Sequence, residues 1–196
     1  MIGLTSPYLW YLTRATGIVT LLLFTSVMVV GIMTATRVGG KQLPKFAVME
    51  VHRRISFLAI SFLGLHILTS LVDSYVNIGI LGVFIPYTSP YKPTFIALGT
   101  LSLDITLAVI ISSVFKNRIS RSLWRTIHWM AYIAWPVAIL HSVFIGTDIR
   151  FIWMDLFVGL NVAAVGAAIV WRIQNNPRPR GARTAVAART AIPKSN

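Results

Sequence analysis

Five apolar segments, each long enough to cross a bilayer as an α-helix, limit what this chain of 196 residues can fold into. A membrane-spanning helix needs about 20 predominantly apolar residues. The hydrocarbon core also admits only structures that satisfy every backbone N–H and C=O internally. The sequence therefore predicts an all-α membrane protein, a five-span transmembrane helix bundle. The expected spans are residues 8–34, 47–72, 94–115, 123–145 and 149–173.

The composition agrees with a membrane protein and excludes several chemistries. Apolar residues make up 56% of the chain, above the share in a typical soluble domain. Because the sequence has no cysteine, it cannot form disulfides, bind metals through thiolates or attach a cofactor through thioether bonds. The net charge of +13 does not indicate nucleic-acid binding, because Lys and Arg flank the apolar segments, where they set membrane topology.

The basic residues gather on one side of the predicted bundle. Fifteen of the 18 Lys and Arg residues lie in or beside the loop after the first span, in the loop between the third and fourth spans, or at the end of the fifth span and beyond it. Since cytoplasmic loops carry the excess of Lys and Arg, we expect the N-terminus outside and the C-terminus in the cytoplasm of a bacterial plasma membrane. Residues 1–173 then form the transmembrane domain, with a short interfacial turn or helix at 78–85. Residues 174–196 form a basic cytoplasmic tail that we expect to be disordered.

All four histidines of the chain lie inside apolar segments, as two pairs. His52 and His66 are in the second span, and His128 and His141 are in the fourth. One span separates these two helices, so they run parallel, and matching depth pairs His52 with His128 and His66 with His141. Polar side chains at such depth are usually functional, and two imidazoles on one iron make a six-coordinate electron carrier. The sequence predicts two stacked b-type haems between the second and fourth helices.

The alternative is that the histidines are unrelated polar residues, each satisfied by helix–helix hydrogen bonds. For both histidines of the fourth span to face the haems, the helix between His128 and His141 must depart from regular α-helical geometry. Fourteen residues at about 100° each return to the same helix face, whereas thirteen leave an offset of roughly 140°. Pro136 lies between His128 and His141, and proline kinks helices. We expect a kink there to turn both rings toward one stack.

Five stretches of the sequence carry a resemblance to a known family. They are LWYLTRATG at 9–17, VHRRISFLAISFLGLH at 51–66, DSYV at 73–76, YKPTFIALG at 91–99 and LWRTIHWMAYIAWPVAILH at 123–141. Over residues 5–172 the chain resembles the ferric-reductase-like transmembrane domain family, whose core occurs in ferric reductases, NADPH oxidases and the haem subunit of the bacterial methionine sulfoxide reductase system. The resemblance implies two b-type haems on the four histidines. Unlike the oxidases, this sequence contains no GxGxxG and no flavin or NADPH domain, so we expect a separate flavoprotein or a quinol as electron donor.

Several arginines have both a functional and a structural interpretation. The family carries an arginine similar to Arg14 beside its outer haem. This implies that Arg14 contacts a haem propionate or the electron acceptor, unless it only reaches the membrane interface. Arg53 and Arg54 follow His52, and Arg125 precedes His128. They either pair with propionates of the inner haem or serve as topology charges.

Four further residues in the spans remain open to two interpretations. Trp135 lies midway between His128 and His141, so its ring either fills the space between the haems or packs in the core. Asp104, in the third span, relays protons, binds a quinone head group or is a hydrogen-bonded structural acid. Gly17 and Gly31 are also 14 residues apart, which allows close backbone approach to each haem or to a neighbouring helix.

The sequence therefore predicts a transmembrane dihaem b-type cytochrome. It would pass electrons from a cytoplasmic or quinol donor to an extracytoplasmic acceptor or reductase, within membrane lipid. One alternative is a quinol-linked haem subunit of a periplasmic reductase. Another is a transporter or scaffold without haem, whose histidines bind a metal ion or carry protons.

The charge distribution makes a direct prediction about topology. A reporter enzyme fused after Asn196 should be active only if it folds in the cytoplasm, because the C-terminus follows the most basic part of the chain. Paired fusions to a cytoplasm-dependent and a periplasm-dependent reporter measure this. An active periplasmic fusion would reverse the assignment of the two sides.

Overall fold

The structure, a computed structural model, describes residues 7–35, 44–73, 76–146 and 151–175. The predicted tail, from residue 176 onward, lies outside these residues. The described residues form seven helices. They are α1 (Pro7–Ala35), α2 (Lys45–Val72), α3 (Ile80–Phe84), α4 (Pro93–Val114), α5 (Arg121–Trp129), α6 (Ala131–Ile145) and α7 (Ile152–Gln174).

Among the described residues, five spans are long and apolar enough to cross a membrane, and they confirm the predicted segments to within three residues. They are α1, α2, α4, the pair α5–α6 and α7. In each span at most 28% of the most apolar stretch is buried inside the protein, so most of its apolar side chains face outward. Such a surface is not tolerated in water but suits lipid. The protein is therefore an integral membrane protein whose described residues form helices and no sheet.

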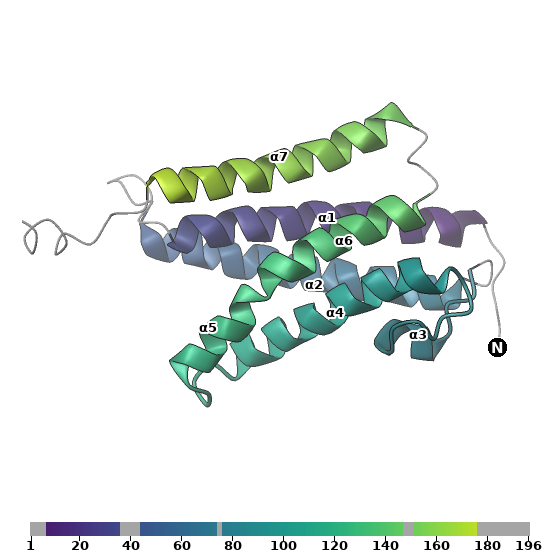
Figure 1. Cartoon of the computed structure of the whole chain (residues 1–196), viewed down its shortest axis with the longest axis horizontal. Coiled ribbons are helices and arrows are strands. Elements are labelled where there is room, and N and C mark those ends of the chain that lie inside the picture. Colours follow the sequence, from purple (N-terminus) through teal and green to yellow (C-terminus); the bar gives the residue numbers. More distant parts are fainter. Residues whose placement is uncertain (1–6, 36–43, 74–75, 147–150, 176–196) are drawn as a thin grey trace, which may run out of the picture.

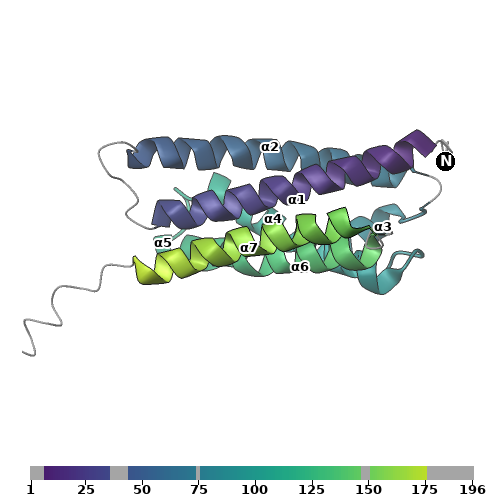
Figure 2. The ribbon, with the colours of Figure 1, turned by 90° about the horizontal axis from the view of Figure 1, so that it is seen from above.

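The five spans lie side by side and alternate in direction (Figures 1 and 2). α2 packs along α1, α4 packs along α6, and α1 also contacts α6 and α7. By contrast, α2 hardly contacts the α5–α6 span. These are the two elements that carry the histidines, and their backbones are held apart by their contacts with α1 and α4. The short helix α3, predicted within the loop at 78–85, packs on α4.

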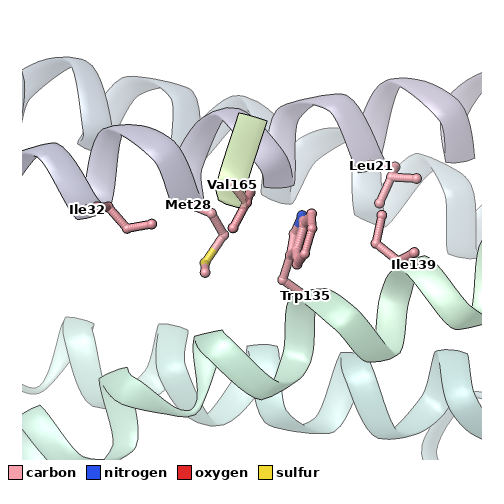
Figure 3. Packing of buried hydrophobic residues seen from close by; sticks show 6 residues of the cluster. All are labelled: Leu21, Met28, Ile32, Trp135, Ile139 and Val165. Atoms are coloured by element: carbon pink, nitrogen blue, oxygen red, sulfur yellow. The ribbon is translucent and has the colours of Figure 1, made fainter. Parts of the chain in front are cut away.

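A small core joins α1, α6 and α7 (Figure 3). It consists of Leu21, Met28, Ile32, Trp135, Ile139 and Val165. Trp135 also donates a hydrogen bond from Nε1 to Thr25 Oγ1 at 3.0 Å. In lipid, helix association depends on close packing and such hydrogen bonds, because lipid tails are as apolar as the side chains. This core holds α6 against α1.

The fourth span is interrupted at Met130, where α5 ends and α6 begins. This interruption lies six residues before Pro136, which itself lies inside α6. At the interruption, Met130 N–H bonds to the Ile127 carbonyl and Ile133 N–H to the Met130 carbonyl. These bonds reach back three residues, and a turn of this type advances about 120° per residue rather than 100°. The tighter turn reduces the angular offset between His128 and His141.

Candidate cofactor site between the histidine helices

His66 and His141 lie on the wall of a cavity of about 260 Å³ bounded mainly by α1, α2, α3, α4 and α6. His66 Nδ1 is 2.9 Å from the Thr13 carbonyl oxygen, and His141 Nδ1 is 2.8 Å from the Phe95 carbonyl oxygen. A carbonyl can only accept, so each Nδ1 must carry the proton. The lone pair of each neutral ring is then on Nε2, which is the state of an imidazole that ligates a metal.

Three glycines allow the histidine rings to approach the neighbouring helices. A Cβ atom at Gly17 would lie 3.0 Å from His66 Cε1, and one at Gly99 would lie 2.7 Å from His141 Cε1. A Cβ at Gly31 would lie 3.2 Å from His52 Cε1. Gly17 and Gly31 therefore contact the histidines rather than leaving room for haem faces. Thr13 and Phe95 each lie four residues before the glycine that their histidine contacts, so the missing side chain opens the way to the carbonyl.

The other pair, His52 and His128, has ring centroids 6.5 Å apart and ring planes at 69°. Trp124 stacks on His128, with centroids 5.0 Å apart and planes at 23°. The Val27 carbonyl lies toward the His52 ring but outside hydrogen-bonding geometry. Three buried nitrogens here lack a hydrogen-bond partner among the described residues: His52 Nδ1, His128 Nδ1 and Trp124 Nε1. Buried polar atoms are normally satisfied, so the nitrogens of this pair are less well satisfied than those of His66 and His141, whose Nδ1 atoms have carbonyl partners.

The number of side chains that gather at one place limits which groups the histidines could hold. Within the described ranges, no three His, Asp or Glu side chains gather closely enough to hold an ion. Two imidazoles suffice for haem, whose porphyrin supplies the other four nitrogens. The ring centroids of His52 and His128 are 6.5 Å apart, so these two imidazoles lie close enough for both to contact one bound group.

The helix α3 closes part of the cavity that contains His66 and His141. Gly82 and Val83 of α3 line the cavity. Thr100 Oγ1 on α4 donates a hydrogen bond to the Gly82 carbonyl at 2.6 Å, which ties α3 to the bundle. A segment too short to span thus becomes part of the cavity wall.

The structure separates the predicted arginines into two groups. Arg14 lines the cavity of His66 and His141, with its guanidinium carbon 4.5 Å from the Trp10 ring centre. Arg53 and Arg54 instead bind Glu50, at 2.8 and 2.7 Å, and their side chains are 68% and 78% exposed. Arg125 is exposed on α5. Only Arg14 of the four is therefore a candidate member of the site.

Trp135 and Asp104 do not line the cavity. Trp135 is buried in the core with Thr25 as its partner, which favours its packing interpretation. Asp104 is half-buried on α4. We include neither in the candidate site.

Comparison of the chain with models of protein families, with curated proteins and with solved structures finds no match.

Sequence reasoning missed two residues of the site, Gly99 and Trp124. Gly99 has no counterpart 14 residues away to mark it, and its role depends on the packing of α4 against α6. Trp124 precedes His128 by four residues, a spacing that places two side chains on one helix face. That spacing was available in the sequence, where Trp124 is equally suited to an aromatic belt at the membrane interface.

The glycine contacts predict a specific stability difference. Gly99→Ala should lower the free energy of unfolding by about 1–3 kcal/mol, because the new methyl group overlaps His141. Gly64→Ala is the matched control, since a Cβ there has nothing within 4 Å. It should be neutral or stabilising by up to about 1 kcal/mol. Thermal unfolding in detergent measures both, and equal midpoints would show that His141 is free to move away.

Proposed function

We propose that this chain is a transmembrane b-type cytochrome that binds two haems and carries electrons across the membrane. The observation that carries the proposal is the fixed tautomer of His66 and His141. Their Nδ1 atoms are held by the Thr13 and Phe95 carbonyls, while both rings line one cavity. A histidine that ligates a metal typically donates its other ring N–H in this way.

The four histidines would hold the two haems, one on His66 and His141 and one on His52 and His128. When bound, each haem supplies an iron centre that gains and loses one electron. The protein keeps the imidazoles neutral, orients them from opposite sides and surrounds them with apolar side chains. The 14 residues between His52 and His66 correspond to about 21 Å along α2. Two such sites therefore reach across most of a hydrocarbon core of about 30 Å.

The distribution of charged residues supports an assignment of the two ends of the bundle to the two sides of the membrane. The described basic residues at the His52–His128 end of the spans are Lys45, Arg53, Arg54, Lys116, Arg118, Arg121, Arg125 and Arg172. We assign this end to the cytoplasm by the positive-inside rule, and a flavoprotein or a quinol as the donor there. Arg14 lies at the other end, where a cation would attract an anionic acceptor or a porphyrin carboxylate. The proposal agrees with the resemblance to the ferric-reductase-like family.

The absence of a three-ligand cluster from the described residues weakens the rival proposal of a metal-ion transporter. A proton-carrying scaffold would need no metal and would give no haem spectrum. Absorption spectroscopy of the purified protein separates these proposals.

Purified protein should carry two non-covalent haems b per chain, because two bis-histidine sites are available and no cysteine can form a thioether. Pyridine haemochrome analysis against protein concentration measures the ratio. Acidified acetone should extract all of the haem. The absence of a Soret band would refute the proposal and favour a scaffold or transporter without haem.

Paired histidine variants test which rings share a haem. The double variant His66→Ala/His141→Ala should keep one haem per chain, because it removes both ligands of a single site. The double variant His52→Ala/His66→Ala also lacks two ligands, but it lacks one from each site. It should therefore misligate or lose both haems. If the two double variants have equal haem content and equal low-spin signals, the assignment of pairs is wrong.

A further inference from the structure

The four histidine rings are not supported in the same way. His66 and His141 each rest on a glycine and bond to a backbone carbonyl. His52 rests on Gly31. His128 contacts none of the glycines in the described ranges, and its Nδ1 has no hydrogen-bond partner there. Something else must hold the His128 ring if it is to act as a ligand.

The neighbour that the structure provides is Trp124. Its indole is nearly parallel to the His128 ring, with centroids 5.0 Å apart. The two residues are four positions apart on α5, so they lie one above the other on the same helix face. We propose that Trp124 is a positioning residue, which holds the His128 ring in its ligating orientation by stacking on it. This inference rests on the proposed haem function.

The local structure of α5 explains why such a support is needed. α5 has nine residues and is separated from α6 by the interruption at Met130, so it lacks the continuous backbone that aligns His141. Its start is fixed by Ser120, whose hydroxyl accepts a hydrogen bond from the Leu123 N–H at 3.2 Å. Trp124 and His128 follow within the same short helix. A stack inside α5 therefore restricts the His128 side chain without requiring a residue from another helix.

The indole N–H gives a second, independent observation. Trp124 Nε1 is buried and has no acceptor among the described residues. A tryptophan that served only as an interfacial anchor would direct this N–H to water or lipid head groups. A buried donor beside a proposed ligand instead suits an acceptor on the bound group, such as a porphyrin carboxylate. Trp124 therefore belongs to the cofactor site rather than to the aromatic belt alone.

The test compares three variants of the full chain, purified in detergent. Trp124→Leu removes the aromatic ring, and Trp124→Phe keeps a ring but removes the N–H. Trp129→Leu is the matched control. Trp129 is on the same helix and 58% exposed, and its ring contacts are with Tyr132 and Arg172. Haem content, the low-spin signal in electron paramagnetic resonance and the carbon monoxide difference spectrum of reduced protein are measured for each.

In Trp124→Leu, the fraction of haem that binds carbon monoxide should rise roughly three- to tenfold over the wild type, the range expected on losing an aromatic stack. The rise should stop at one of the two haems, because His66 and His141 keep their carbonyl bonds. Trp124→Phe should restore most of the wild-type behaviour, and Trp129→Leu should match the wild type. Adding Trp124→Leu to His128→Ala should cause no further change, since Trp124 acts through His128.

Unchanged carbon monoxide binding in a haem-loaded Trp124→Leu protein would overturn this inference and leave the proposed function intact. A wild-type protein without haem would overturn both. If Trp124→Leu is not recovered folded, Trp124→Met carries the same test, because methionine fills the space without an aromatic ring. If the spectra of Trp124→Phe and Trp124→Leu differ from the wild type to the same extent, the effect comes from the loss of the indole N–H. That result would overturn the role of stacking.

Discussion

The arrangement of the bundle depends on how closely α1 and α4 approach the histidine rings. α2 packs on α1 and α6 packs on α4, whereas the two histidine-bearing spans hardly contact each other. This is possible because α1 and α4 present glycines where the rings meet them, at Gly17, Gly31 and Gly99. A larger residue at any of these positions would push a ring into the space between the spans. α1 and α4 therefore position the rings of His52, His66 and His141, whereas His128 contacts none of the described glycines.

Hydrogen bonding makes the two pairs chemically different. The rings of His66 and His141 each donate to a carbonyl, which fixes the tautomer and makes the ring a stronger ligand. His52 and His128 have no such bond to the described residues. The first pair is thus held by the backbone of α1 and α4, and the second by packing and by the Trp124 stack. Each pair consists of two histidines, but hydrogen bonds to the backbone orient the rings of one pair and side-chain packing orients the rings of the other.

Sequence alone predicts the spans because lipid leaves the backbone no alternative to the helix over 20 or more apolar residues. The same reasoning places His52 near His128, since one intervening span makes their helices parallel. It fails at Met130, where the interruption depends on a change in backbone hydrogen bonds that no glycine or proline marks. It also leaves the role of Trp135 open, because its partner Thr25 is 110 residues away in the chain. The local sequence pattern predicts how deep a residue lies in the membrane and which way its helix runs. Where its side chain points depends on packing between segments that are distant in the sequence.

The two ends of the bundle also differ in what surrounds them. The cavity of His66 and His141 is bounded by five helices, and α3 is tied over it by the bond from Thr100 to Gly82. The His52–His128 pair is held partly by α5, whose basic residues Arg121 and Arg125 are exposed. A site that receives electrons from a separate donor needs an approachable surface, and cations on that surface would guide an anionic partner toward it. The exposed cations of α5 therefore support the proposed entry of electrons at that end of the bundle.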